Sequence, residues 1–310
     1  MRAVRNAVGR VEVIDVDEPA GDGVLVRVTA VGICASDLLY LARGSEQIAG
    51  HEIAGVLEDG TPVAVEAIFG CGTCDQCAQG KYNLCELCGV EILGMTKPGG
   101  MAEYFRAPQR ALVPLPAGLD PADACLVEPG SVAWHGCRVG GVGPDVRAAV
   151  VGGGGIGQLA VAAARALGAA DVALEARHDH QRTVGEQFGA TTPTGLYDVV
   201  IEAAGSDSGL HRAMELVRPE GTIVTIGLHP PDTVWPHRQQ FLKEVRIAPA
   251  IGYCGHDQQR EFAEVAGMLA AKPEIARALI THRFGIDDAV AAFAAAGVRA
   301  AGTLRVVVHP

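Results

Sequence analysis

The sequence predicts an α/β protein in two parts, a β-rich lobe and a doubly wound parallel sheet. In residues 11–31 and 50–65, apolar and polar side chains alternate between breaks that contain glycine or proline, which is typical of strands with one buried face. From residue 148 to residue 226, short apolar segments alternate with helical ones, which is the order of a doubly wound sheet. A length of 310 residues with 49% hydrophobic side chains allows two domains with sizeable cores.

The parallel sheet is predicted from four short apolar strands with helical segments between them. Right-handed crossovers through those helices would bring the strands side by side. The predicted strands are 148–151, 172–175, 199–202 and 222–226, and the predicted helices are 158–167, 182–188 and 210–217.

The β-rich lobe is predicted to use both ends of the chain. The alternating strand and helix pattern defines one domain over 129–252, which leaves 1–128 and 253–310 for the second domain. Outside the parallel sheet we expect strands at 101–105, 112–116 and 303–308, and helices from about Pro121 and over 132–139, 261–269 and 287–296.

Composition excludes several classes of partner. A net charge of −11 argues against nucleic acid or an anionic membrane, because both need clustered lysine and arginine. There is no apolar run of about eighteen residues, and residues 1–5 lead into strand-like alternation rather than into a signal peptide. We therefore expect a cytoplasmic protein, in which nine cysteines indicate metal binding rather than disulfides.

Four cysteines form a candidate structural zinc site. Cys71, Cys74, Cys77 and Cys85 lie within fifteen residues of a glycine-containing loop. Four thiolates in a closed tetrahedral set favour Zn²⁺. An Fe–S cluster is the main alternative, but the spacing matches neither the bacterial nor the plant-type ferredoxin pattern.

A second candidate metal site is dispersed along the chain. Cys34 follows a predicted strand, His51 and Glu52 begin one, and Glu128 lies further along. A thiolate, an imidazole and carboxylates with one position left open are typical of catalytic zinc. Taken singly, Cys34 is equally explained as a buried apolar residue and Glu128 as a helix-start carboxylate.

The glycine turn that follows the first parallel strand is predicted to bind a dinucleotide. Glycines in a G-x-G-x-x-G pattern permit a tight turn and a close approach of the backbone to a pyrophosphate at the helix N-terminus. The strand before it and the helix after it favour that interpretation over a flexible loop. The residues of the turn are Gly152, Gly154, Gly155, Ile156 and Gly157.

The motifs together resemble those of one enzyme family. Their order along the chain is similar to that of the zinc-containing medium-chain dehydrogenase/reductases, the alcohol, sorbitol, threonine and glucose dehydrogenase group. The resemblance implies an N-terminal GroES-like catalytic domain and a Rossmann domain. It is carried by Cys34-x-Ser-Asp, Gly50-His51-Glu52, the four-cysteine loop, residues 100–104, Val127-Glu128-Pro129, the glycine turn, residues 198–205 and residues 280–284.

The resemblance also implies roles for the dispersed metal residues. Cys34 and His51 match ligands of the catalytic zinc, and Glu52 matches a carboxylate that either binds the metal or lies close to it. Glu128 stands where simple alcohol dehydrogenases have cysteine and the polyol and glucose branch has glutamate. Asp37 matches the carboxylate that orients the ligand histidine.

Proton transfer and nicotinamide binding are implied in the same way. Ser36 matches the hydroxyl that passes the substrate proton toward solvent. Leu39 stands where many relatives have a relay histidine, so the proton must leave by another route, through Tyr40 or water. Ile156, Leu228 and Ile251 match positions that pack against or hydrogen-bond the nicotinamide, although each is equally explained as core.

The choice of cofactor depends on the end of the second parallel strand. Nineteen residues past Gly157 stands Ala176, followed by Arg177 and His178. A small residue followed by arginine accommodates a 2′-phosphate, so we expect NADP(H). A register shift of one residue would place Glu175 there and favour NAD(H).

The predicted function is reversible oxidation of a polyol, sugar or secondary alcohol to a ketone or aldehyde, with two zinc ions per chain. Family behaviour and strand edges around 222–226 suggest a homodimer or homotetramer. Two alternatives remain open: a zinc-independent enone or quinone reductase of the same architecture, and a regulator that binds NADP without catalysis.

Overall fold

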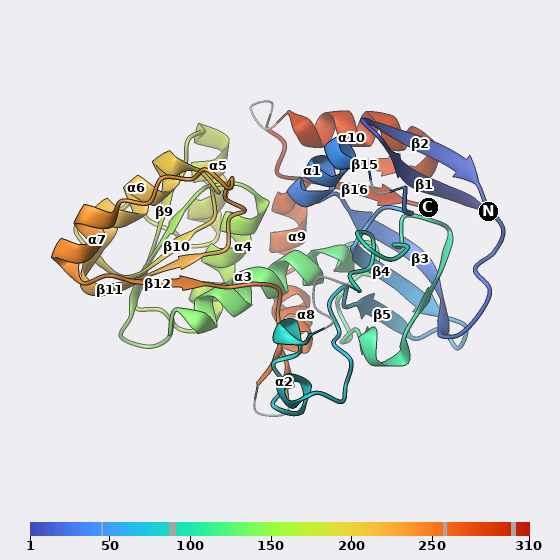
Figure 1. The fold of residues 1–310 in the computed structure, drawn as a ribbon, viewed down its shortest axis with the longest axis horizontal. Helices are drawn as coiled ribbons and strands as arrows, with labels where there is room; N and C mark the ends of the chain where they lie inside the picture. Colours follow the sequence, from blue (N-terminus) through green and yellow to red (C-terminus); the bar gives the residue numbers. More distant parts are fainter. Residues whose placement is uncertain (45, 87–90, 257–258, 299–301) are drawn as a thin grey trace. The chain divides into compact units, whose positions relative to one another are not determined.

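The computed structural model describes residues 1–310 except 45, 87–90, 257–258 and 299–301. The chain forms two compact units (Figure 1). Unit 1 comprises Met1–Pro129 and Tyr253–Pro310, and unit 2 comprises Gly130–Gly252. None of the described helices is long and apolar enough to cross a membrane.

Unit 1 is built on a seven-stranded sheet. Six strands follow the order β15-β16-β3-β4-β5-β7, and β6 pairs with β3 on the side opposite β4. All pairs are antiparallel except β15 with β16. The bounds are β3 Val24–Gly32, β4 Glu52–Leu57, β5 Pro62–Val65, β6 Tyr104–Ala107, β7 Leu112–Pro114, β15 Ile280–Gly285 and β16 Arg305–His309.

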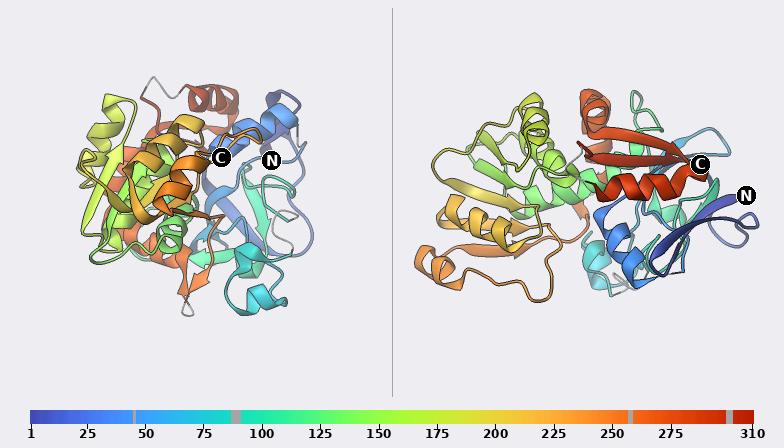
Figure 2. Two further views of the ribbon diagram at one scale, coloured as in Figure 1. Left: turned by 60° about the vertical axis from the view of Figure 1, so that its left-hand side comes forward. Right: turned by 90° about the horizontal axis from the view of Figure 1, so that it is seen from above.

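A ribbon of two strands covers part of the core of unit 1. β1 (Arg2–Ala7) pairs with β2 (Arg10–Asp15), and α10 (Ala289–Gly297) packs against β2 and β16 (Figure 2). The core between them consists of branched and aromatic side chains such as Val26, Ile53, Phe105 and Phe293. Burial of these side chains supplies the main stabilisation of the unit.

The remaining elements of unit 1 are short. The helices are α1 Ala35–Arg43, α2 Asp75–Ala78, α8 Glu261–Ala271 and α9 Glu274–Leu279, with 3₁₀ turns η1 Tyr82–Leu84, η2 Gln109–Ala111, η3 Ala124–Leu126 and η4 Ile286–Asp288. β13 (Gly255–His256) and β14 (Gln259–Arg260) form a small hairpin. α3 (Val127–Val139) begins at the end of the first segment of unit 1 and continues in unit 2.

Unit 2 is a parallel sheet of five strands in the order β12-β11-β10-β8-β9. The strands are β8 Arg147–Val151, β9 Asp171–Glu175, β10 Tyr197–Glu202, β11 Val217–Thr225 and β12 Arg246–Pro249. They alternate with α4 Gly155–Ala166, α5 Asp179–Gln187, α6 Asp207–Leu216 and α7 His237–Lys243. The strand order reverses between β8 and β10, and ligands of such sheets bind at the carboxyl ends beside that point.

Burial explains why these segments form a doubly wound sheet. Ala148 to Val151 of β8 are all buried, as expected for a parallel strand with a neighbour on each side and helices on its faces. In α4 the buried face consists largely of alanine and glycine, so this helix packs close to the strands. All four predicted parallel strands are present, and each helix predicted between them overlaps an observed one.

Three expectations were wrong. No separate helix begins near Pro121, because η3 runs directly into α3, and Glu128 and Pro129 lie in the first turn of that helix. Proline is tolerated there because the first helical N–H groups have no partner within the helix. The strand around 222–226 is not an edge either, since β11 lies between β10 and β12. The third error concerns residues 101–105, where the strand begins only at Tyr104.

Candidate metal and dinucleotide sites

The four cysteines of the predicted structural site come together in unit 1. The Sγ atoms of Cys71, Cys74, Cys77 and Cys85 all lie within 4.8 Å of one another. α2 and η1 fold the loop so that Cys77 lies in a helix and Cys85 follows a 3₁₀ turn. Four sulfur ligands at this separation fit a tetrahedral zinc ion.

Backbone amides in this loop stabilise thiolates. The Sγ of Cys71 accepts hydrogen bonds of 3.3 Å from the Thr73 hydroxyl, the Thr73 N–H and the Cys74 N–H. These bonds lower the pKa of Cys71 to about 5, whereas burial raises the pKa of Cys77 to about 12. A cation bound among the four sulfurs would offset the cost at Cys77, so the donor set fits a metal.

A partly buried ion pair between Arg260 and the buried Glu66 anchors the four-cysteine loop to the sheet. The Tyr82 hydroxyl donates to Oε1 of Glu66 at 2.7 Å, and Nε of Arg260 donates to the same oxygen at 3.0 Å. Arg260 also donates to the carbonyls of Leu112 and Arg110, both at 2.9 Å. The loop is therefore held at a fixed place beside β5.

Three of the dispersed metal residues also meet. Cys34 lies between β3 and α1, His51 directly precedes β4, and Glu52 is the first residue of that strand. One ligand atom from each lies within 4.8 Å of the other two. His51 is 4% exposed and Glu52 is fully buried. Because β3 and β4 are antiparallel, the end of one strand and the start of the next bring these side chains together.

Asp37 supports both Cys34 and His51. Its Oδ2 accepts a hydrogen bond of 2.8 Å from the Cys34 N–H, and its Oδ1 lies 3.2 Å from Nδ1 of His51. Burial lowers the pKa of His51, but the Asp37 carboxylate and the Cys34 thiol outweigh it and raise the pKa well above its usual value. A cation is therefore electrostatically favoured at the imidazole.

Glu52 is held by a charge that the sequence analysis did not identify. Nη2 of Arg305, in β16, donates to Oε2 of Glu52, and both side chains are buried. Oε1 of Glu52 has no hydrogen-bond partner among the described residues. An orphaned buried carboxylate oxygen beside a thiol and an imidazole fits a metal ligand. An arginine within the predicted apolar strand 303–308 was the available signal, because a buried arginine needs a partner.

Glu128 lies near this cluster, but its carboxylate is not part of the group of ligand atoms formed by Cys34, His51 and Glu52. It is 7% exposed and stands in the first turn of α3, at the end of the first segment of unit 1. Burial raises its pKa to about 7, with a further contribution from Glu52, while His51 and Arg305 oppose the rise. Of the described residues at this site, only Cys34, His51 and Glu52 each have a ligand atom within 4.8 Å of the other two.

The predicted proton-transfer residues lie on α1. Ser36 is 6% exposed, and its hydroxyl has no partner among the described residues. Leu39 is 44% exposed, and the side chain of Tyr40 lies outside the described part of the structure. Ser36 therefore has a hydroxyl available to a ligand.

The cysteines outside both sites are buried. Cys125, Cys137 and Cys254 are 1%, 0% and 9% exposed. Burial raises the pKa of Cys125 and of Cys137 to about 12, which keeps those thiols neutral. Cys88 lies outside the described residues.

In unit 2 the glycine turn connects β8 to α4. Gly152 has φ +116°, a conformation that side chains rarely adopt, and its N–H donates to the Glu175 carbonyl at 2.9 Å. Gly154 is the N-cap of α4, and Gly155, Ile156 and Gly157 form the first turn. A Cβ on Gly157 would lie 1.7 Å from the Gly152 carbonyl oxygen, so the helix starts in contact with the turn. The N-terminus of α4 is thus at the carboxyl edge beside the switch point, where a pyrophosphate fits.

The expected ribose-reading residues follow β9 directly. Ala176 is 7% exposed, Arg177 is exposed, and His178 is the N-cap of α5. The carboxylate of Glu175 accepts a hydrogen bond of 2.8 Å from Nε of Arg212 in α6. Glu175 is therefore already paired within the protein.

Large apolar side chains are exposed beyond β11 and β12. Leu228 is 67% exposed and Ile251 is 54% exposed, so neither is a core residue. Between them in the chain, Nε2 of His229 lies 2.8 Å from the buried Glu202 carboxylate, whose Oε1 accepts the N–H groups of Ala204 and Gly205. This pair holds the loops after β10 and β11 and was not identified from the sequence.

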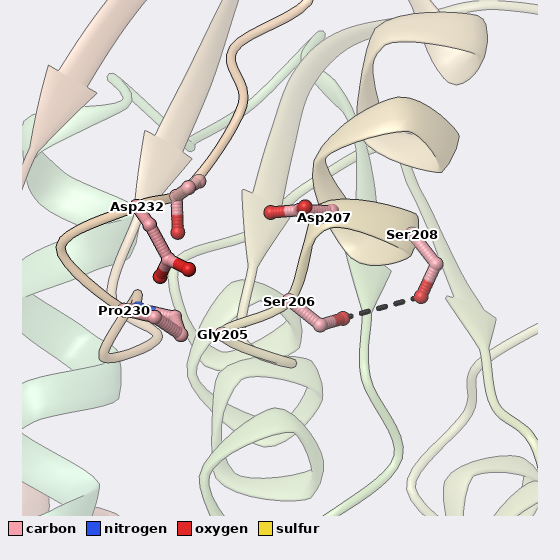
Figure 3. A pocket seen from close by; sticks show the side chains of 7 residues that line it. Gly205, Ser206, Asp207, Ser208, Pro230 and Asp232 are labelled. Carbon is pink, nitrogen blue, oxygen red and sulfur yellow. Dashed lines mark hydrogen bonds between the residues drawn. The ribbon is translucent and has the colours of Figure 1, made fainter.

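A cavity of about 390 Å³ opens at the carboxyl ends of β10 and β11 (Figure 3). The hydroxyls of Ser206 and Ser208 lie 3.3 Å apart at its edge, and the side chains of Asp207 and Asp232 line it (Figure 3). Two carboxylates disfavour a phosphate here. The cavity therefore does not compete with the glycine turn for the pyrophosphate.

Comparisons with known proteins agree with this geometry. The family model "Alcohol dehydrogenase GroES-like domain" matches residues 20–117, and "Zinc-binding dehydrogenase" matches residues 155–271. L-galactonate-5-dehydrogenase of Escherichia coli (strain K12) is 29% identical over 299 residues, which cover 86% of this chain and 85% of the relative. Sorbitol dehydrogenase of Bacillus subtilis (strain 168) is 31% identical over 256 residues, which cover 71% of this chain and 72% of the relative.

The chain belongs to the zinc-containing medium-chain dehydrogenase/reductases. Within this family it resembles the sorbitol and polyol dehydrogenases. A crystal structure of a zinc-binding dehydrogenase from Sinorhizobium meliloti 1021 bound to NADP has a TM-score of 0.85 and 28% identity, and the match covers 100% of this chain and 99% of that one.

Membership confirms the fold class and the enzyme class. The medium-chain dehydrogenase has a GroES-like fold in unit 1 and a Rossmann sheet in unit 2. It is a zinc-dependent, NAD(P)-dependent alcohol dehydrogenase. The roles of individual residues stay predictions.

Proposed function

We propose that this dehydrogenase oxidises a secondary alcohol group of a polyol or sugar with NADP⁺ and reduces the corresponding ketone with NADPH. The observation on which the proposal depends is the buried group formed by Cys34, His51 and Glu52, with Asp37 behind it. Such a donor set with an open position suits a catalytic zinc rather than a structural one. Glu128, close to these charges, is a further candidate ligand.

The cofactors define the chemistry at this site. Bound zinc would supply a Lewis acid that lowers the pKa of the substrate hydroxyl, and NADP⁺ would supply the hydride acceptor. Cys34 and His51 would hold the metal, with Glu52 as a third ligand or close neighbour. The four-cysteine loop would hold the second zinc.

The residues around the metal site have distinct roles in this proposal. Oγ of Ser36, buried and without a protein partner, accepts the substrate proton. Asp37, whose Oδ1 lies 3.2 Å from Nδ1 of His51, would orient the ring so that the other nitrogen can bind the metal. Arg305 fixes one oxygen of Glu52 and leaves the other for the metal. The proton then leaves by water, since Leu39 cannot relay it.

NADP(H) is favoured by the pairing of Glu175. A carboxylate that reads the ribose must be available to its hydroxyls, whereas Glu175 is engaged by Arg212. The next residue, Ala176, is small and buried, and Arg177 is exposed beside it. This arrangement supports accommodation of a 2′-phosphate. The related Sinorhizobium meliloti protein is bound to NADP.

The substrate class follows from relatives named for L-galactonate and sorbitol. Glu128 at the position expected for the polyol branch agrees with it. We further propose that unit 1 is the catalytic domain and unit 2 the dinucleotide-binding domain. The chain would assemble as a homodimer or homotetramer, for which β12, the edge strand beyond β11, offers unpaired backbone groups.

Steady-state kinetics with a panel of polyols, sugars and hydroxy-ketones test the proposal. We expect turnover of at least one polyol or sugar, with a higher kcat/KM for NADP⁺ than for NAD⁺. A clear advantage for NAD⁺ would remove the cofactor assignment. Reduction of enones or quinones by metal-free enzyme would indicate the zinc-independent reductase, and binding of NADP⁺ without turnover of any substrate would indicate a regulator.

A further inference from the structure

A fully buried amide joins the glycine turn to the segment that follows β9. Gln158 is the residue after Gly157 in α4 and is 0% exposed. Its Nε2 donates to the Gly153 carbonyl at 3.2 Å and to the Gln181 carbonyl at 2.7 Å. One side chain thus bonds two backbone segments that are separated in the chain.

The two carbonyls belong to the two halves of the proposed dinucleotide site. Gly153 lies in the turn between β8 and α4, where the pyrophosphate is expected. Gln181 lies in the first turn of α5 and ends the segment that begins at Ala176, where the adenosine ribose and its substituent are expected. The relative position of these halves decides whether one ligand can contact both.

The two segments are also in direct contact. A Cβ on Gly153 would lie 2.5 Å from Cβ of Ala176 and 2.8 Å from Cβ of Gln181, so only glycine allows this approach. Oε1 of Gln181 in turn accepts the N–H of His178 at 3.4 Å. The amide of Gln158 therefore lies behind a contact that extends to the N-cap of α5.

We propose that Gln158 is a positioning residue for cofactor recognition, which fixes the segment 176–181 against the pyrophosphate turn. The inference rests on the proposed binding of NADP(H) at this edge of unit 2. Gln158 touches neither phosphate nor ribose in this account and acts through Gly153 and Gln181.

A purely space-filling role explains the site less well. A buried carboxamide costs free energy unless it is hydrogen-bonded, and leucine would fill similar volume without that cost. Oε1 of Gln158 has no partner among the described residues, so both useful bonds are made by Nε2. Replacement by leucine removes a desolvated oxygen but leaves the Gly153 and Gln181 carbonyls without the Nε2 donor, so a modest loss of folding stability is expected. The distance between the two segments would no longer be fixed.

The kinetic constants of the variant Gln158→Leu for the cofactor test the positioning role separately from folding stability. We expect KM for NADP⁺ to rise by about tenfold, the effect of losing roughly one to two hydrogen bonds, with kcat within about twofold of wild type. The kcat/KM ratio of NADP⁺ to NAD⁺ should fall, because NAD⁺ has no 2′-phosphate to misplace. Gln187→Leu, which exchanges an exposed amide on α5, the helix that contains Gln181, is the matched control and should leave all constants unchanged.

Binding of 2′,5′-ADP by titration calorimetry gives a second readout that needs no turnover. Gln158→Met, with an unbranched side chain and no donor, is measured alongside in case the leucine variant does not fold. Unchanged KM and unchanged 2′,5′-ADP affinity in a folded variant would overturn the proposal. Equal losses for 2′,5′-ADP and for a nicotinamide mononucleotide would overturn it too, because they would indicate general damage to unit 2.

The wild-type ratio of kcat/KM for the two cofactors tests the proposed cofactor independently. If the wild type prefers NAD⁺, the NADP(H) assignment fails. Gln158 is then tested by KM for NAD⁺, which should rise, and by 5′-AMP affinity, which should weaken, because the segment 176–181 lies where the adenosine ribose is expected.

Discussion

At the scale of single residues, Gly32 is constrained by the carboxylate of Glu52. A Cβ on Gly32 would lie 1.9 Å from Oε2 of Glu52 and 3.1 Å from its carboxyl carbon. That oxygen is also the one bonded by Arg305, so it cannot move without breaking a buried ion pair. The absence of a side chain at residue 32 is thus a requirement of the candidate metal site.

Gly32→Ala should lower kcat/KM by at least about tenfold and reduce zinc content at the candidate catalytic site, because Glu52 must be displaced. Metal analysis together with steady-state kinetics measures both effects. Gly267→Ala is the matched control, since a Cβ at this exposed position in α8 meets nothing within 4 Å. If Gly32→Ala retains full activity and two zinc ions, Glu52 does not need its observed position.

Arg305 should contribute to stability as well as to the site. Arg305→Met leaves the fully buried Glu52 carboxylate without its counter-charge, and loss of one partner of a buried pair costs about 3–5 kcal/mol. Denaturant unfolding measures the difference. Arg5→Met, which breaks an ion pair of the half-exposed Arg5 with Glu12, should cost no more than about 1 kcal/mol. Equal losses in the two variants would contradict the argument.

At the scale of elements, Asp198 links three strands of the parallel sheet. From β10, its Oδ1 accepts Nε of Arg218 in β11 at 2.7 Å, and its Oδ2 accepts the N–H of Arg147 in β8 at 2.8 Å. These bonds lower the pKa of Asp198 below its ordinary value, with Arg218 as the largest cause. The ionised carboxylate therefore stabilises the folded sheet.

The pH dependence of stability follows from the direction of that shift. A lowered pKa contributes stability above the unfolded value of about 3.8 and loses it as pH falls toward the lower, folded value. Asp198→Asn should lower the free energy of unfolding by roughly 1 kcal/mol at pH 7, and the gap to wild type should narrow near pH 3. Denaturant unfolding between pH 3 and 7 measures it. A gap that widens with acidity would reverse the assigned sign, and Arg218→Met should show part of the same loss.

Strand positions were predicted more accurately than strand neighbours. The segment 148–151 was placed within one residue because four consecutive buried apolar residues are a local property. That β11 is covered by β12 is not local, since Arg246–Pro249 is short, partly exposed and has no strong apolar pattern. The same limit applies to η3 and α3, where the pattern around Glu128-Pro129 suggested a break between two helices.

At the scale of the whole molecule, the sequence predicted which residues would meet better than what would hold them. Cysteine spacing predicted the four-thiol group, and family motifs predicted that Cys34 and His51 would come together with Glu52. The arginines that hold these two sites in place lie more than 190 positions away in the chain. Arg305 bonds Glu52, and Arg260 bonds Glu66, which anchors the four-cysteine loop. No motif links such pairs, because their contact depends on the pairing of β16 with β3 and on the placement of β14.

The central claim is that one zinc ion is catalytic and the other structural. Zinc content and turnover, measured together in wild type, Cys34→Ser and Cys74→Ser, test it most directly. We expect about two zinc ions per chain in wild type. Cys34→Ser should keep the fold and one zinc ion and lose turnover, whereas Cys74→Ser should lose the other zinc ion and unfold more readily. Wild-type turnover in Cys34→Ser, or two zinc ions retained by it, would contradict the account.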